Sequence, residues 1–403
     1  MTYGRAAISA PVGGLLITAL LWWAGASAHA LYLPGTVDVL GGQSAAELQR
    51  WLTPWSYDSP ASLRFGPEVS GGIGDPAGTD GTRYLALYRT ALQIRFGAVF
   101  VFFVAGVLLL VRRLPPVHSR WFATLSAVWA WGLVAGTLAV TVSAPWLIAS
   151  QGHGSYRLLP QLASVISSGR QILVVTALVT AVGTVLVARV TAKGADAPVQ
   201  EAVSARTARL AATVGTAVVA VSLVVLSHQS VAARLQSISL HNGLLAEPGD
   251  LLRQWLLLGA WTGPAGTPLG DWLLYRGADV LLLAVVWWAL WRLPLLLTRA
   301  TVPAMALGAV CATVLGLLAS QLLRMATDGT GLHWGLIHLP AGIGDGVPAA
   351  LTFGLVAGGA AAVTLRLAAD RAEATGAMAS TQGSARSQEQ NDRTVPGPRS
   401  DNS

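Results

Sequence analysis

Long runs of apolar residues alternate along this chain with polar segments, and most of the runs are long enough to cross a bilayer as a helix. A hydrocarbon core about 30 Å thick takes roughly 20 helical residues, and only a helix satisfies its own backbone hydrogen bonds there. Six runs approach or exceed this length without containing a charged residue. They are residues 6–28, 121–146, 171–188, 210–226, 302–323 and 347–365.

Two further runs are weaker. Residues 96–111 are short, but Arg95 and Arg112 flank them and can extend their side chains to the two interfaces. The run around residues 280–291 reaches spanning length in one of two ways, by including Asp279 and the two residues before it or by continuing past Arg292 to Thr298. The pattern predicts an all-α polytopic membrane helical bundle of about eight transmembrane helices.

Composition agrees with this prediction. The chain is 53% hydrophobic and 11% charged, whereas ordinary soluble domains hold roughly 25% charged residues. The net charge of +7 comes from basic residues scattered at the ends of apolar runs rather than on one face, which argues against a nucleic-acid partner. We expect membrane lipids as partners, and the bias toward Ala, Gly, Val, Leu and Arg indicates a bacterial source.

The short loops predict the orientation, because Lys and Arg are retained on the cytoplasmic side. With eight spans, the Arg-bearing segments 112–120, 189–209 and 292–299 fall on one side together with both termini. We therefore expect a plasma-membrane protein with both termini in the cytoplasm. The small residues at 26–30 also fit a signal-peptide cleavage site, which is the alternative for the first span.

Matching landmarks in the same order predict a tandem repeat of four spans plus four. The pairs are residues 48–52 with 252–256, 87–91 with 274–278, 113–115 with 292–294, and 159–160 with 339–340. The alternative is chance matching in a sequence of low complexity. The repeat predicts halves of parallel orientation, related by an axis along the membrane normal.

The repeat also defines the expected domain boundaries. The first repeat covers residues 1–190 with a long outer loop at 31–95, a linker covers 191–209, and the second repeat covers 210–371. Residues 372–403 are rich in Ser, Gln and Asn, so we expect a disordered cytoplasmic tail.

Small residues recur four positions apart in the third and seventh spans, and such stripes let helices approach closely. We expect helix packing at Gly132, Gly136, Gly308, Ala312 and Gly316, with the third and seventh spans meeting near the pseudo-twofold centre. A plain composition bias toward Gly and Ala is the alternative.

Motifs for chemistry are sparse. The sequence has no Walker motif, no Rossmann fingerprint and no zinc-protease motif, and its one cysteine excludes a disulfide. We therefore expect no cofactor, no metal and no catalytic residues. His333 and His338 have acidic neighbours in the last outer loop, but their spacing is not diagnostic of a metal or acid-base site.

The outer loops offer one candidate binding surface. Tryptophan and arginine recur at landmark positions of both halves, where they could flank an outer-face groove and meet phosphate groups. The residues are Arg50, Trp51, Arg89, Arg253, Trp255 and Arg276. The alternative is plain lipid anchoring. The sequence favours a transport-related or lipid-facing permease-like component; the rivals are an envelope scaffold that binds proteins through its outer loops and a membrane enzyme with an extracytoplasmic site.

Overall fold

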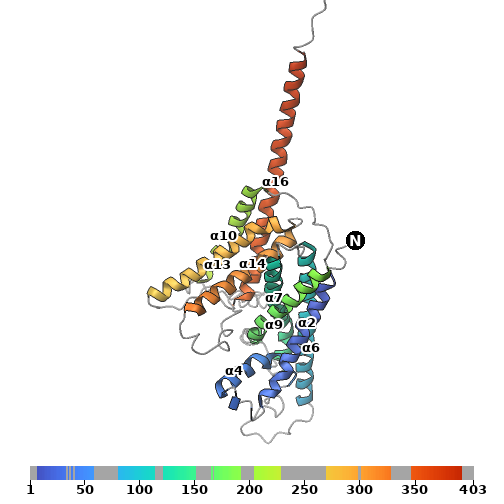
Figure 1. Cartoon of the computed structure of the whole chain (residues 1–403), viewed down its shortest axis with the longest axis vertical. Coiled ribbons are helices and arrows are strands. Elements are labelled where there is room, and N and C mark those ends of the chain that lie inside the picture. Colours follow the sequence, from blue (N-terminus) through green and yellow to red (C-terminus); the bar gives the residue numbers. More distant parts are fainter. Residues whose placement is uncertain are drawn as a thin grey trace, which may run out of the picture.

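The computed structural model describes the helical part of the chain and several short connecting pieces. These are residues 7–32, 35, 38–39, 41–58, 80–113, 121–150, 165–166, 168–191, 204–227, 269–297, 301–327 and 346–392. Every regular element in this part is helical, as the sequence predicts (Figure 1).

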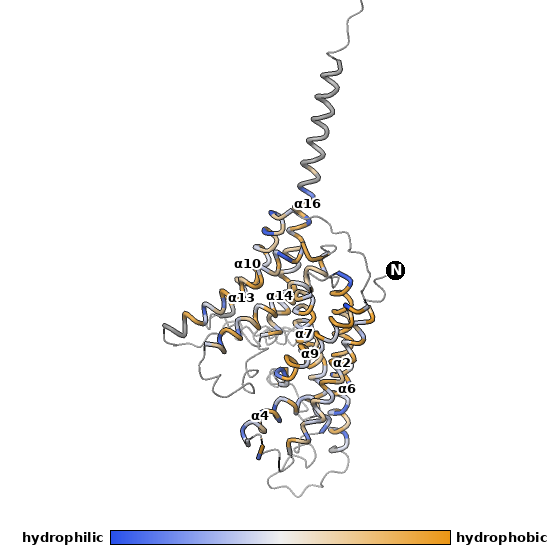
Figure 2. The backbone as a smooth tube through the Cα atoms, in the orientation of Figure 1, coloured by the Kyte–Doolittle hydropathy of each residue, from blue (hydrophilic) through white to orange (hydrophobic). Residues whose placement is uncertain are grey.

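Eight helices are long and apolar enough to cross a membrane, which confirms the predicted polytopic bundle. They are α2 (Ser9–Ser27), α6 (Asp80–Arg113), α7 (Trp121–Ser150), α9 (Arg170–Thr191), α10 (Ala205–Ser227), α13 (Leu269–Leu296), α14 (Val302–Thr327) and α16 (Val347–Asp392). Between α2 and α6 lie η1 (Ala28–Tyr32), α4 (Gly42–Leu52) and η2 (Thr53–Trp55). Figure 2 shows the apolar positions running along the spans, with polar positions gathered in α4 and near helix ends.

Two spans extend further than their apolar runs. The helix α6 has 34 residues and is therefore about 51 Å long, so the last part of the predicted outer segment, from residue 80 to 95, is helical and continuous with the second span. The sixth span, Leu273–Leu296, both includes Asp279 and continues past Arg292. In each case a helix continues beyond the apolar segment because Leu, Ala, Arg and Gln favour helix whether or not lipid surrounds them.

The last helix also extends beyond the sequence-based expectation. The composition predicts disorder from Ala372 onward, whereas α16 continues through Asp392. The physical reason is that alanine is the most frequent residue between these positions and glutamine is also common, and both favour helix. Low hydrophobicity indicates that a segment lacks a core, but it does not prevent an extension of a helix that packing has already nucleated.

Each set of four consecutive spans packs in the same cyclic order. In the first half α2 packs against α6, α6 against α7, α7 against α9, and α9 against α2. In the second half α10, α13, α14 and α16 follow one another around a ring in the same way. Both halves are therefore antiparallel four-helix bundles in which each helix contacts the one before it and the one after it.

The two bundles meet mainly where α7 packs against α14, the third and seventh spans. The Cys311 thiol of α14 lies 3.4 Å from the Ala127 carbonyl oxygen of α7. These are also the most enclosed spans, with 61% and 67% of their apolar windows buried, compared with at most 50% for the others. One buried apolar cluster continues from Phe103 in the first bundle to Val310 in the second.

The glycines of the small-residue stripes face helices of their own half. A Cβ added at Gly132 or Gly136 would meet α9, at Ala177 and Leu173 respectively. A Cβ added at Gly308 or Gly316 of α14 would meet Leu293 or the Leu282 carbonyl oxygen respectively, both on α13. Ala312, which lies between these two glycines on α14, is buried. The stripes thus allow close packing within each bundle, beside the face that α7 and α14 present to each other.

Between two described spans, α14 and α16 make a very close backbone approach. A Cβ at Gly358 would lie 2.5 Å from the Ala306 Cα and 2.6 Å from the Met305 carbonyl oxygen. Thr313 also donates a hydrogen bond to the Ala350 carbonyl oxygen of α16 at 2.9 Å. Such contact is possible only where glycine removes the side chain from the interface.

This contact generates a matched pair of substitutions. We expect Gly358→Ala to destabilise the bundle by about 1–3 kcal/mol, because the added methyl group collides with backbone that cannot move aside. Gly359→Ala on the same helix should leave stability unchanged or slightly raised, since nothing lies within 4 Å of its Cβ position. Thermal unfolding in detergent, followed by tryptophan fluorescence, tests both. Equal melting temperatures for the two variants would contradict the packing.

Candidate functional site

Two charged side chains are buried in the described part of the chain, Arg95 on α6 and Asp279 on α13, which are 1% and 7% exposed. Charges at membrane depth are costly, and they persist where they pair with one another or serve a function. Both lie toward the same end of the two bundles, in the second span of each half. The surroundings of these two residues form the candidate site.

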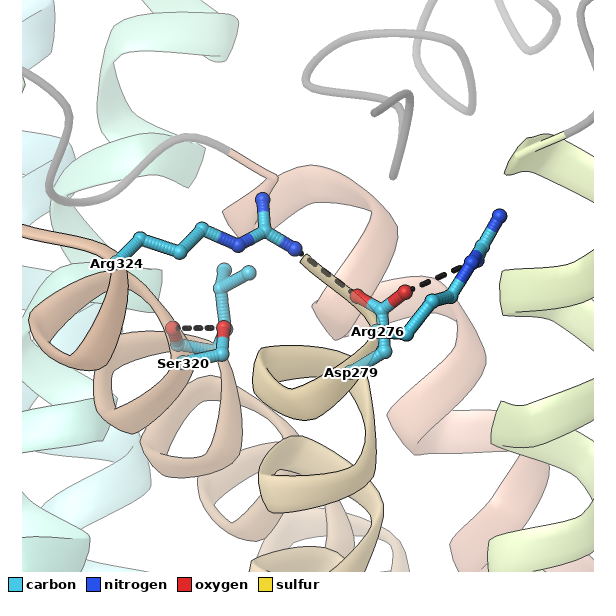
Figure 3. Close-up of polar contacts among 5 residues, drawn as sticks. Arg276, Asp279, Ser320 and Arg324 are labelled. Atoms are coloured by element: carbon cyan, nitrogen blue, oxygen red, sulfur yellow. Dashed lines mark hydrogen bonds and ion pairs between the residues drawn. The ribbon is translucent and has the colours of Figure 1, made fainter. Parts of the chain in front are cut away.

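The first group of contacts is the Asp279 cluster, which consists of Asp279, Arg276, Arg324 and Tyr275; Figure 3 shows the first three. Arg276 Nη1 lies 3.1 Å from Asp279 Oδ2, and Arg324 Nη2 lies 2.9 Å from Asp279 Oδ1. The Arg324 guanidinium also lies over the Tyr275 ring, 4.9 Å from its centroid. Each carboxylate oxygen therefore accepts from a different arginine.

The helices explain this geometry. Arg276 and Asp279 are three positions apart on α13, so they face the same side of one helical turn, while Arg324 reaches across from the last turn of α14. Ser320, one turn below Arg324, donates back to the Leu317 carbonyl oxygen and satisfies its own hydroxyl (Figure 3). One carboxylate is thus shared by two guanidiniums, and its contact with Arg324 ties α13 to α14.

The second group is the Arg95 cluster, which consists of Arg95, Trp55, Tyr88 and Ser143. Arg95 Nε donates to Ser143 Oγ of α7 at 2.9 Å, and its Nη1 donates to the Pro54 carbonyl oxygen of η2. Its guanidinium lies 5.6 Å from the centroid of the Trp55 ring. Arg95 thus connects α6, α7 and the short outer segment at η2 through neutral groups alone.

Trp55 is fully buried and fixes η2 onto the first bundle. Its indole N–H donates to the carbonyl oxygen of Gly169 at 3.0 Å, and Gly169 adopts a φ of 70° that few other residues tolerate. On the other side the Trp55 carbonyl group lies so close to Gly25 of α2 that no side chain would fit there. The Tyr88 hydroxyl donates to the Ser56 carbonyl oxygen at 2.8 Å and holds the end of the same segment.

An aromatic pair covers the outer side of this segment. The Tyr57 and Phe96 rings stack with centroids 5.6 Å apart, and Phe96 also contacts Trp55 at 5.9 Å. Partial burial raises the pKa of the Tyr57 phenol above its ordinary value, so this group is a neutral donor at physiological pH.

The positive charge of Arg95 is not balanced by any carboxylate in the described part of the chain. Its Nη2 atom is buried and makes no hydrogen bond there. The nearby Asp58 carboxylate contacts His29 Nδ1 at 3.2 Å. A buried guanidinium with one unsatisfied nitrogen and no counterion is costly, and this is the main electrostatic anomaly of the described structure.

The predicted groove residues have different outcomes. Arg50 and Arg89 are exposed on α4 and α6, and Trp51 is half-buried at the end of α4. Arg276 joins the Asp279 cluster. Arg253 and Trp255 lie outside the described residues, as do the histidines at 333 and 338. The proposal that these six residues form one groove therefore stays a prediction.

Sequence reasoning missed the partners that form both clusters. In the sequence, Arg95 and Asp279 each lie at the boundary of an apolar run, and nothing in the pattern singles out Trp55 as more buried than Trp51. One feature of the sequence could have identified both residues: each is a single charge directly beside an apolar run that is too short to span the bilayer. Such a charge is placed at membrane depth once the helix extends, and it then needs a partner from a neighbouring helix.

In comparisons with known proteins, no family model, no curated protein and no solved structure matches this chain. Among the described residues no group of three or more His, Cys, Asp or Glu side chains is arranged to hold a metal ion. The chemistry of the site must therefore be argued from its own charges.

The Asp279 cluster predicts a specific double-mutant result. We expect Asp279→Leu to destabilise the protein by about 3–5 kcal/mol, because it leaves Arg324 without its counterion. Adding Arg324→Leu should restore most of the loss, since the pair is then replaced by apolar groups. Arg276→Gln should have a small effect because this side chain is 46% exposed. Thermal unfolding of the wild type, Asp279→Leu, Arg324→Leu and the double variant in detergent measures the coupling; additive losses would show that the pair is not formed.

Proposed function

We propose that this integral multi-pass membrane protein is a transport-related, permease-like component of the plasma membrane, and that it recognises an anionic group at the outer end of its bundles. The observation that carries the proposal is the buried Arg95 guanidinium, whose Nη2 lacks a hydrogen-bond partner and whose charge lacks a carboxylate within the described residues. An oxyanion would supply both at once, because a guanidinium binds phosphate and carboxylate oxygens strongly.

The surroundings of Arg95 favour recognition over plain structural support. Nε and Nη1 are already held by Ser143 and Pro54, so the side chain is fixed in one orientation before any anion arrives, and little conformational entropy remains to be lost on binding. Arg95 is covered in part by η2, whose Pro54 carbonyl group and Trp55 ring contact it and which lies outside the spans. Outward displacement of η2 would admit an anion to the guanidinium in exchange for the Pro54 and Gly169 hydrogen bonds that hold this segment.

The second half also gathers arginines at this end. Its Asp279 carboxylate is shared by Arg276 and Arg324, so two guanidiniums lie beside one carboxylate there. An anion that approached Arg324 would compete with Asp279 for its guanidinium, which would loosen the tie between α13 and α14.

We further propose that the halves arose by duplication and run parallel. Two facts support this proposal: the four spans of each half follow the same cyclic order of contacts, and Tyr88 and Tyr275, which the landmarks align, both lie beside a cluster arginine. Leu92, which aligns with Asp279, is buried at the corresponding place in the first half. The charge thus differs between the halves while the position is kept.

An envelope scaffold is the second candidate function, and one observation favours it. The helix α16 has 46 residues, which corresponds to about 69 Å, more than twice the thickness of a bilayer core. Its extension past the span would present a long helical surface to a partner. The outer loops through which we expect a scaffold to bind lie mostly outside the described residues.

The test of anion recognition uses the purified full chain in a neutral detergent. Inorganic phosphate and a short-chain phosphatidylglycerol are added in separate experiments. We expect at least one of them to raise the melting temperature of the protein by several degrees. Arg95→Gln should abolish the rise, because it removes the charge. Arg95→Lys should retain part of it and should keep the protein folded if Gln does not. Arg83→Gln, which changes an exposed arginine on the same helix, is the control. A full rise in Arg95→Gln would refute the proposal.

Orientation is a separate expectation. We propose that both termini are cytoplasmic, supported by the arginines that cluster at one end of the bundles: Arg112, Arg113, Arg189, Arg206, Arg209, Arg292, Arg366 and Arg371. Green fluorescent protein fused after Ser403 should fluoresce, and alkaline phosphatase fused after Ser150 should be active, because each reporter works on one side of the membrane only. The reverse pattern would invert the topology.

A further inference from the structure

Two arginines from different helices converge on one tryptophan at the end of the second bundle that lies opposite the Asp279 cluster. The Arg209 guanidinium of α10 lies 5.7 Å from the centroid of the Trp291 ring, and that of Arg292 on α13 lies 5.1 Å from the same ring. Arg292 also lies 5.8 Å from the Trp288 ring. We call Arg209, Arg292, Trp288 and Trp291 the Arg–Trp cluster.

The charges of this cluster are alike. Because both guanidiniums lie within 6 Å of one ring, they are at most about 11 Å apart, which is close to the screening distance in physiological salt. Neither arginine forms an ion pair in the described part of the chain. Since α10 and α13 pack against each other, the bundle itself keeps the two positive charges together, and an anion between them would lower their repulsion.

The depth of the cluster points to the bilayer interface. Arg292 follows Asp279 by 13 positions on α13, a rise of about 20 Å, so the clusters lie toward opposite faces of the membrane. Both arginines are exposed. Trp288 is also 56% exposed, as expected where an indole contacts lipid headgroups.

The tryptophans add donors and an apolar wall. Trp291 stacks on Trp287 with ring centroids 5.7 Å apart, which fixes the ring that both guanidiniums cover. The indole N–H of Trp291 is buried and makes no hydrogen bond to a described group. A ligand that fits this cluster combines an oxyanion with an apolar portion.

We infer that the Arg–Trp cluster binds the phosphate group of an anionic phospholipid in the leaflet at this end, with Arg209 and Arg292 on the phosphate oxygens and Trp288 beside the glycerol and acyl chains. Guanidinium binds phosphate by charge-assisted hydrogen bonds, and a surface tryptophan suits the interface where a headgroup meets its chains. This site does not depend on Arg95, because it lies on other helices and at the other end of the membrane.

The test measures lipid preference. The full-length protein is purified, exchanged into nanodiscs of phosphatidylcholine with or without phosphatidylglycerol, and released for native mass spectrometry to count retained lipids. We expect wild type to retain phosphatidylglycerol about tenfold over phosphatidylcholine, and Arg209→Gln/Arg292→Gln to lose this preference. The single variants should each lose part of it, so the test stands if the double variant does not fold.

A control of equal charge separates a site from general attraction. Arg112→Gln/Arg206→Gln removes two exposed arginines from the same end without touching the cluster and should keep the preference. Equal loss in both double variants, or none in the cluster variant, would overturn the site. Inorganic phosphate is the competitor that distinguishes a lipid from a free anion: if millimolar phosphate stabilises the protein through Arg209 and Arg292 while phosphatidylglycerol is not retained, the assignment to a lipid is wrong.

Discussion

Close backbone contact between neighbouring helices is the interaction on which the rest of this structure depends. Lipid tails are as apolar as leucine, so burying apolar side chains between helices gives little driving force in a bilayer, and dispersion at short range must hold the bundle together. Glycine at 358, 316 and 132 removes side chains where α16, α13 and α9 approach their partners. Buried donors then cross the same short gaps, as when the Trp131 indole donates to the Phe102 carbonyl oxygen. An apolar core built in this way leaves few places for charge.

The number of spans could be predicted from the sequence because the cost of transferring a segment to lipid is a sum over its residues and needs no knowledge of partners. The charged clusters could not. Arg95 bonds to groups 41 and 48 positions away, and Arg324 reaches a carboxylate 45 positions away, so no local window contains both members of a contact. The glycine stripes lie between these cases: periodicity identified the smooth faces of α7 and α14, but it could not say which neighbour each face would meet.

The same limit explains the errors in helix ends. Hydropathy reports where lipid begins, whereas a helix ends where its backbone bonds and propensity end. The sixth span shows the difference, because its helix includes both Asp279 and Arg292, residues that hydropathy treats as alternative limits. Continuation of the helix through Asp279 and Arg276 is what places these two side chains on one face, where Arg324 of α14 reaches the carboxylate. The charged cluster is therefore a consequence of helix length, and helix length was the least readable property of the sequence.

The two ends of the molecule hold arginine in different ways, and this contrast bears on function. At one end Arg209 and Arg292 are exposed beside tryptophan, as membrane insertion alone would favour on a cytoplasmic face. At the other end Arg95 and Arg324 turn inward, toward neighbouring helices and away from lipid. Insertion does not require arginine there, and Arg95 gains no carboxylate from the described protein in return. A residue that is costly in both the membrane and the fold persists where its charge serves a function, and this cost is the physical basis for the proposal that Arg95 recognises an anion.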